Sequence, residues 1–208
     1  MKLFLFGGAE LNLGQGQPLK DLIKRTIQRL HPTSILHIPF ARLHPTEEAF
    51  KEGWFKEIMQ NTGIEILDAR IETDVEKAHH PLVFINGGHD KADLIEGIKN
   101  NKKILNIILN ADYIVSESSG SMVTAEYMKL DKKGEEIVRG LGILKDTIIE
   151  PHYSERNSQH LLIHEMKQAH AKYGIGIDCV TAIVIDPATF PSTWDKIGDG
   201  NVEVKRAG

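Results

Sequence analysis

The stretch "ADYIVSESSGSMVTAEYMKL", residues 111–130, decides how this chain is interpreted. It begins as an apolar run typical of a buried strand, stops in the cluster "SESSGS" (116–121), and continues with a spacing that predicts a helix. A serine at such a corner has two interpretations. Its hydroxyl caps the helix by accepting from a backbone N–H, or a strained turn exposes it for chemistry, as in a nucleophile elbow. The stretch alone leaves both open, because Ser116 stands where the usual G-x-S-x-G elbow has its first glycine.

Other short apolar runs precede this one and alternate with amphipathic segments. The runs read as strands at 2–6, 34–40, 64–67 and 82–85, with helical spacing at 18–30, 46–61 and 91–100. Apolar runs of this length are typical of strands buried on both faces, as in parallel sheets. The alternation predicts right-handed βαβ units, and therefore an α/β fold in which a doubly wound, mostly parallel sheet forms the middle of three layers.

The second half of the chain is less regular. We expect short strands and turns over 135–153, a helix over 158–173, two strands with a tight turn over 174–186, and an edge strand in "NVEVKRAG" (201–208). Repeats and linkers are absent from the sequence. A single domain covering residues 1–208 is the simplest expectation.

Composition favours a soluble protein that acts on small molecules. Of the 208 residues, 41% are hydrophobic and 26% are charged, and the formal net charge is -4 without a basic stripe, which argues against nucleic acid as a partner. No run approaches the roughly 18 apolar residues of a membrane helix. A single cysteine, Cys179, forms no internal disulfide and favours a reducing compartment. We therefore expect a cytoplasmic enzyme or binding protein without membrane contact, and the oligomeric state stays open, a homodimer included.

Three predicted strand ends carry polar or glycine-rich residues: "FGGAE" (6–10), "INGGHDK" (85–91) and "SESSGSM" (116–122). Open α/β sheets bind ligands beyond the carboxyl ends of their strands, so these segments are expected near one another. A histidine follows a later apolar run in "IIEPHYSER" (148–156), where a neighbouring strand would deliver a general base. Glycine pair, serine and histidine thus occur in the order of a serine hydrolase site.

In this order and spacing, the motifs resemble the peptidase E and cyanophycinase family of serine peptidases, whose fold is like that of class I glutamine amidotransferases (flavodoxin-like). The resemblance runs from "LFGGAE" (5–10) to "GIGIDCVTAIVI" (174–185), which is most of the chain. It implies that Ser118 is the nucleophile and His152 its base. The activity implied is cleavage of small peptides through an acyl-enzyme, with dipeptides containing an acidic residue as one candidate substrate, and without a cofactor.

The same resemblance assigns the residues around the nucleophile. Backbone N–H groups of Gly88 and Ser119 would form the oxyanion hole, and Gly87, His89 and Arg156 would contact the substrate. Positions where the family has further arginines carry Ser158 and Leu161 here.

The acid of the catalytic triad is the open question. Cyanophycinase-like members carry an acidic residue directly after "GIGID", where this chain has Cys179. Peptidase E-like members place it after the nucleophile, in a region where Asp131 is the first candidate, with Glu126 and Glu150 as alternatives. A binding or regulatory protein with an inert site is therefore a second hypothesis. The two differ in whether a carboxylate reaches the ring nitrogen of His152 that faces away from Ser118.

Ten histidines raise the question of a metal site. His160 and His164 are four residues apart, and two histidines are adjacent at 79–80, but a pattern such as H-E-x-x-H is missing. The glycines of "GGAELNLGQG" (7–16) do not match a dinucleotide fingerprint. We therefore expect no metal and no nucleotide cofactor, and we interpret Cys179 as a buried structural thiol.

Overall fold

Five short apolar segments pair side by side in parallel to form the centre of the structure. This structure is a computed structural model that describes residues 1–42 and 53–208. The segments are β1 (Lys2–Phe6), β2 (Ser34–Ile38), β3 (Glu65–Asp68), β4 (Leu82–Ile85) and β5 (Tyr113–Glu117). Two antiparallel strands, β10 (Ala182–Ile185) and β11 (Asp195–Ile197), complete a seven-stranded sheet with the order β11-β10-β1-β5-β4-β2-β3. The predicted mostly parallel sheet is confirmed.

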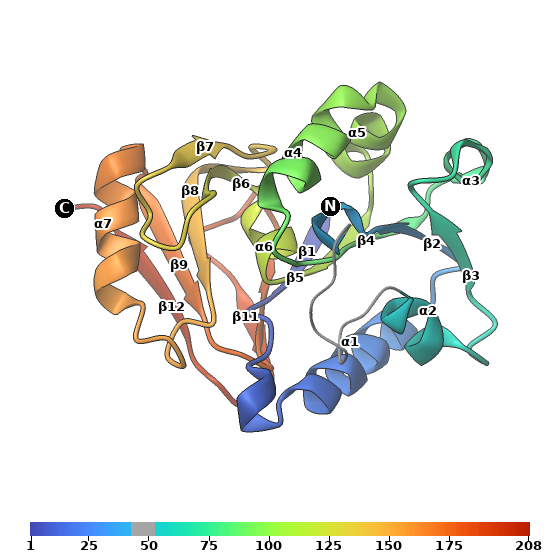
Figure 1. The fold of residues 1–208 in the computed structure, drawn as a ribbon, viewed down its shortest axis with the longest axis horizontal. Helices are drawn as coiled ribbons and strands as arrows, with labels where there is room; N and C mark the ends of the chain where they lie inside the picture. The colour runs from blue at the N-terminus through green and yellow to red at the C-terminus, as the bar shows by residue number, and fades with distance from the viewer. Residues whose placement is uncertain (43–52) are drawn as a thin grey trace.

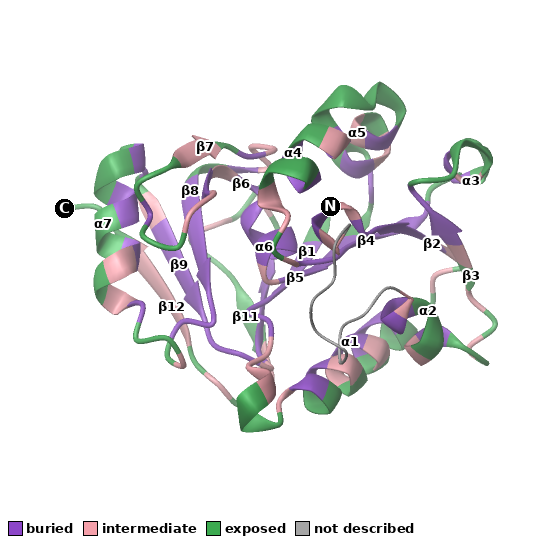
Figure 2. Ribbon diagram, in the orientation of Figure 1, coloured by how far each residue is buried: buried purple, intermediate pink, exposed green. Residues whose placement is uncertain are grey.

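Helices cover both faces of this sheet because side chains alternate along its buried strands (Figure 1). Phe4 and Phe6 pack with α1 (Gly16–Leu30) and α2 (Trp54–Met59). Leu3 and Leu5 face the other way, into a cluster that includes side chains of α3 (Glu72–Lys77), α4 (Lys91–Asn100) and α5 (Lys102–Leu109). Figure 2 shows the central strands buried and the outer sides of these helices exposed. This is the expected three-layer arrangement.

A second, five-stranded sheet is formed largely by the irregular half of the sequence. Its strands are β6 (Ala125–Lys129), β7 (Ile137–Arg139), β8 (Leu144–Pro151), β9 (Tyr173–Ile177) and β12 (Val202–Arg206), in the order β12-β9-β8-β6-β7. Helix α7 (Gln159–Ala169) packs on its outer face, at the far side of the molecule from α3 (Figure 1). Ile149 and Ile175 of this sheet belong to the same apolar cluster as Leu3 and Leu5. The two sheets therefore share a core.

The segment after the serine corner differs from the prediction. Instead of a long helix, the chain forms the four-residue helix α6 (Ser119–Met122) and then enters the second sheet as β6. There β6 pairs with β7 on one side and β8 on the other, and this pairing outweighs the helical spacing of its side chains. The two strands predicted over 174–186 are β9 and β10, but they belong to different sheets.

The remaining elements are short or partly outside the described ranges. The predicted helix over 46–61 is observed as α2, while its beginning, as far as residue 52, lies outside the described residues. Single 3-10 turns occur at Leu11–Leu13 (η1) and Phe40–Arg42 (η2). The predicted C-terminal edge strand is β12. Within residues 1–42 and 53–208, every helix is too short or too polar to cross a bilayer.

Candidate active site

Ser118 occupies a strained corner between β5 and α6. Its backbone angles are φ 52° and ψ -121°, outside the regions that non-glycine residues ordinarily adopt. Such a conformation costs about 1–3 kcal/mol and persists only where the surroundings enforce it. The Ser118 N–H donates to the carbonyl of Phe6 at 2.9 Å, which ties the corner to the end of β1. The side chain makes no capping hydrogen bond to α6, so the geometry is that of an elbow and not of a helix cap.

The hydroxyl of Ser118 contacts the imidazole of His152. Its Oγ lies 3.0 Å from Nε2, although the two residues are 34 positions apart in the sequence. His152 follows the last residue of β8, Pro151, and its backbone N–H donates to the carbonyl of Gly7 at 3.0 Å. The end of β1 therefore holds both residues, one from each sheet.

Gly8 lies at the centre of this junction. Its φ of +93° disfavours any other residue, and a Cβ built on it would stand 2.6 Å from Nε2 of His152. A side chain there would displace the imidazole. Gly8 is thus required for the close approach of His152 to Ser118.

The other ring nitrogen of His152 faces Glu10 and Cys179. Nδ1 lies 3.0 Å from Oε1 of Glu10 and 3.2 Å from Sγ of Cys179. Nε of Arg156 donates to the same Glu10 oxygen at 2.6 Å, and this bond holds the carboxylate in place. When Nδ1–H donates to Glu10, Nε2 is left as an acceptor for the Ser118 hydroxyl. Serine, histidine and carboxylate thus form a connected triad.

The three acids predicted for this role lie elsewhere, which corrects that expectation. The Asp131 carboxylate accepts backbone N–H groups of Lys133, Glu135 and Glu136 in its own turn. Glu126 accepts the backbone N–H of Asp146 and pairs with Arg139, and Glu150 pairs with Lys129. These local partners occupy the three carboxylates, and none of the three contacts His152 in the described ranges.

Sequence reasoning missed Glu10, although "FGGAE" had been placed among the polar strand ends. The feature that could have identified Glu10 is its position shortly after β1, which lies next to β5 in the sheet. The sequence did not indicate that the end of β1 lies next to the end of β8. Strand β8 belongs to the second sheet, which the sequence did not predict.

Burial keeps His152 neutral. Removal from water lowers its pKa from 6.5 to about 3, and the positive charges of Arg156, Lys129 and His89 act in the same direction. A neutral imidazole is the form that accepts a proton from a serine hydroxyl. Burial and the negative charge of Glu155 raise the pKa of Cys179 far above its ordinary value, so this side chain stays a protonated thiol.

Of the two backbone N–H groups predicted to form the oxyanion hole, that of Ser119 is available and that of Gly88 is already hydrogen-bonded. The Ser119 N–H at the start of α6 has no acceptor in the described part of the chain and is available to an oxyanion. The Gly88 N–H instead donates to Oγ of Ser119 at 2.8 Å, and that hydroxyl donates to the Gly88 carbonyl at 2.9 Å. A Cβ on Gly88 would meet the carbonyl oxygen of Ala41 at 1.9 Å, so the loop passes where only glycine fits. Gly88 can serve an oxyanion only after the Ser119 side chain rotates away.

The remaining serines of the cluster have structural roles. Ser116 and Ser121 are fully buried, with their hydroxyl oxygens 3.1 Å apart, and Ser121 donates to the carbonyl of Phe6 at 2.9 Å. The Ser119 hydroxyl is hydrogen-bonded to both the N–H and the carbonyl of Gly88. Of the four candidate serines, Ser118 is the one that contacts the imidazole.

A cavity of about 550 Å³ opens beside Ser118 and His152. His89 and Arg156 line it as expected, whereas Gly87 does not, because its buried N–H donates to Oε1 of Glu117 at 2.7 Å. Charged side chains dominate the wall: Arg42, Lys91, Lys129, Lys132 and Arg156 are basic, and Glu10, Glu117 and Glu150 are acidic. Each of the three glutamates is paired with one of these cations. The excess of basic groups favours a ligand with negative charge.

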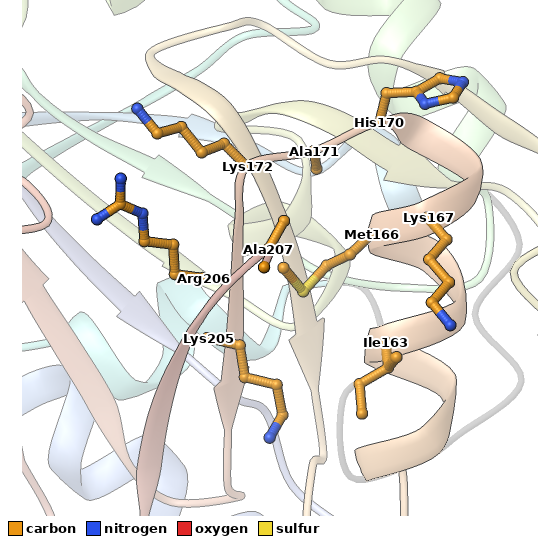
Figure 3. Close-up of a pocket in the computed structure, with 10 residues that line it drawn as sticks. Ile163, Met166, Lys167, His170, Ala171, Lys172, Lys205, Arg206 and Ala207 are labelled. Carbon is orange, nitrogen blue, oxygen red and sulfur yellow. The ribbon is translucent and has the colours of Figure 1, made fainter.

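A larger cavity of about 840 Å³ lies between α7 and β12 (Figure 3). Ile163 and Met166 form its apolar part, and Lys167, Lys205 and Arg206 surround it. None of its lining residues lines the Ser118 cavity. The elbow and the triad therefore identify the smaller cavity as the candidate active site.

Comparisons with known proteins show the family and the fold of the chain. A family model described as "Peptidase family S51" matches residues 3–192. Among solved structures, a peptidase from an acI-B1 Actinobacterium is 21% identical, with a TM-score of 0.67, and the alignment covers 100% of this chain and 94% of that one. A candidate peptidase E protein from Listeria monocytogenes EGD-e is 18% identical, with a TM-score of 0.59, and the alignment covers 100% and 98% of the two chains. At these identities the two structures show the fold. A search of curated proteins found no match.

Proposed function

The chain belongs to peptidase family S51 and is a serine peptidase, and from this premise we propose that it cleaves small peptides through an acyl-enzyme on Ser118. The observation that carries the proposal is the continuous contact from Ser118 Oγ through the His152 ring to the Glu10 carboxylate. The resemblance noted in the sequence is confirmed by the family match.

The contacts support a role for each residue in the proposed reaction. Ser118 Oγ attacks the carbonyl carbon of the scissile bond while its proton passes to Nε2 of His152. Glu10 stabilises the imidazolium that forms, and the Ser119 N–H donates to the oxyanion. The imidazolium then gives its proton to the leaving amine as the C–N bond breaks.

Deacylation uses the same groups in reverse. A water molecule gives its proton to His152 and attacks the ester carbonyl, and the C–O bond to Ser118 breaks as Oγ takes the proton back. The product acid leaves, and the serine hydroxyl is restored. Each proton that moves is carried by the same ring nitrogen, Nε2 of His152.

We infer a preference for peptides with an acidic residue from the charge of the cavity. Five lysine and arginine side chains line it, against three glutamates. This arrangement supports binding of a carboxylate next to the scissile bond, although the arginines expected at 158 and 161 are absent. We also propose a cytoplasmic location, since a free cysteine is compatible with a reducing compartment.

A binding or regulatory protein with an inert site was the alternative hypothesis. It required that no carboxylate reach the ring nitrogen of His152 that faces away from Ser118. The position of Glu10, 3.0 Å from that nitrogen, favours the hydrolase.

An active-site-directed serine reagent tests the proposal. We expect one label per chain, located on Ser118, and loss of labelling in His152→Ala. Absence of labelling in the folded protein would favour the inert alternative. A panel of dipeptides that differ only in an acidic, neutral or basic first residue tests the preference, and equal cleavage of all three would remove the acidic preference while leaving the peptidase intact.

A further inference from the structure

Three side chains that metals commonly use as ligands meet at the back of the His152 ring. Glu10 follows β1, His152 follows β8 and Cys179 follows β9, and their ligand atoms all lie within 4.8 Å of one another. His152 and Cys179 are buried, and Glu10 is partly buried. A carboxylate and an imidazole suffice for a triad, so the mechanism gives the thiol no task.

We propose that Glu10, His152 and Cys179 form a binding site for a divalent metal ion of the zinc class, and that the occupied site is catalytically inactive. The inactivation rests on the proposed peptidase function, whereas metal binding itself does not. The site would make hydrolysis responsive to the concentration of free zinc.

The distances suit zinc after a small adjustment. Zinc binds nitrogen and carboxylate oxygen at about 2.0–2.2 Å and sulfur at about 2.3 Å, so tetrahedral ligands lie roughly 3.4–3.6 Å apart. Here Nδ1 lies 3.0 Å from the Glu10 oxygen and 3.2 Å from the Cys179 sulfur. Each of these two contacts therefore opens by only a few tenths of an ångström, and the Glu10 oxygen and the Cys179 sulfur lie within 4.8 Å of each other. Glu10 and His152 also line the cavity beside Ser118, which provides the route of entry and room for a water as fourth ligand.

The mixture of donors discriminates between metals. Thiolate and imidazole ligands suit zinc and its cobalt substitute, whereas magnesium and calcium require oxygen ligands. Two of the three ligands here are a sulfur and a nitrogen, which match neither magnesium nor calcium. We therefore expect selectivity for zinc over the more abundant cations.

Nearby charges balance the ion. A thiolate from Cys179 and the Glu10 carboxylate together neutralise two positive charges. Outside them, the Glu155 carboxylate accepts the backbone N–H of Cys179 at 3.1 Å, and Arg156 donates to Glu10 at 2.6 Å, so these two charges offset each other. Binding releases the thiol proton to solvent, so no other reactant is required.

Occupation would stop catalysis through the tautomer of His152. With the metal on Nδ1, a neutral imidazole carries its proton on Nε2. Nε2 then no longer accepts from the Ser118 hydroxyl, which lies 3.0 Å away. The Glu10 carboxylate is also withdrawn from its role beside the ring.

Cobalt titration of the metal-free protein tests the site without reference to activity. We expect one equivalent of Co²⁺ to produce a near-ultraviolet charge-transfer band from a thiolate ligand. The band should vanish in Cys179→Ala and in Cys179→Ser, with circular dichroism showing that at least one of these variants is folded. Cobalt binding without a thiolate band in the natural protein would overturn the proposal.

A matched control tests whether the metal binds to surface histidines instead of the proposed site. His160 and His164 are exposed and four residues apart, which is a spacing that binds metals on helix surfaces. The double variant His160→Ala with His164→Ala should keep the band. Loss of cobalt binding in this variant would assign the metal to the surface pair and overturn the proposal.

Peptide hydrolysis tests whether the bound metal inactivates the protein. Zn²⁺ should inhibit the natural protein, and Mg²⁺ at the same concentration should not. In Cys179→Ala, the zinc concentration for half-inhibition, relative to that variant's own rate, should rise about 100-fold or more, because even the loss of an outer-shell partner costs about 10- to 100-fold in metal affinity. Equal sensitivity of the two proteins would show that zinc inhibits elsewhere. A protein that binds cobalt through Cys179 but is not labelled on Ser118 would retain the metal site and lose the peptidase.

Discussion

The carboxylate of Glu10 lies 3.0 Å from Nδ1 of His152, the ring nitrogen that Ser118 does not contact. The family resemblance pointed to acidic residues that follow Ser118 in the sequence, whereas Glu10 precedes it. A triad requires only that a carboxylate face the imidazole, so the chain segment that supplies it is free to differ. This contact leads directly to the first prediction.

Glu10→Gln should lower kcat by about 10²- to 10⁴-fold, since an amide neither fixes the tautomer of His152 nor stabilises its positive charge. Asp131→Asn is the matched control and should leave kcat within a factor of about two, because the Asp131 carboxylate serves only its own turn. Steady-state hydrolysis of a dipeptide measures both. The reverse ranking would restore Asp131 as the catalytic acid.

Ser118→Ala should reduce peptide hydrolysis by roughly 10³-fold or more, as expected for loss of a triad nucleophile. The midpoint of thermal unfolding should change little, because the Ser118 side chain caps no helix. Ser121→Ala serves as the comparison. Its buried hydroxyl donates to Phe6, so we expect a loss of about 1–2 kcal/mol in the free energy of unfolding. If Ser118→Ala is instead mainly a stability variant, the capping interpretation was right.

Gly8→Ala should impair catalysis through geometry. The added Cβ would stand 2.6 Å from Nε2 of His152, and the imidazole must move to accommodate it. A displacement of about 1 Å costs about 10²-fold in rate. Gly14→Ala provides a control at positive φ, because nothing lies near its Cβ position. Comparable losses of kcat in the two variants would point to backbone strain and not to displacement of His152.

His37 should make the protein less stable in mild acid. It is buried against the stacked rings of Phe55 and Phe84, and burial lowers its pKa from 6.5 to about 4. The unfolded chain regains the ordinary pKa and binds the proton more readily between these two values. The free energy of unfolding must therefore decrease as the pH falls from 6.5 towards 4.

Denaturant unfolding at several pH values checks this expectation. His37→Phe removes the titration, and it also removes the 3.2 Å contact of the His37 ring with Oδ1 of buried Asn86, so the comparison rests on the slope. The stability of this variant should fall less steeply with decreasing pH, by up to about 1.4 kcal/mol per pH unit. His152 has a lowered pKa as well and should account for part of the slope that remains. Identical slopes in the two proteins would show that the fold does not lower the pKa of His37.

Local patterns were sufficient for the central sheet. The apolar runs at 2–6 and 82–85 coincide with β1 and β4, and the helical spacing at 91–100 coincides with α4. These elements are buried on one or both sides in the way their periodicity indicates. The segment after Ser118 carries helical spacing too, yet it forms β6, because its pairing with β7 and β8 is a long-range interaction that no local window contains.

The sequence by itself determined the parallel sheet, because that depends on local periodicity, and its short motifs at strand ends carried the family resemblance that implies the pair Ser118 and His152. Only the tertiary structure decided that Glu10 faces the imidazole and that the Gly88 N–H donates a hydrogen bond to the Ser119 hydroxyl. The first contact joins the segment after β1 to the end of β8 in the second sheet, and the second contact joins the segments that follow the neighbouring strands β4 and β5. A side chain's neighbours across such a junction follow from how whole elements pack, and that information is distributed over the entire chain.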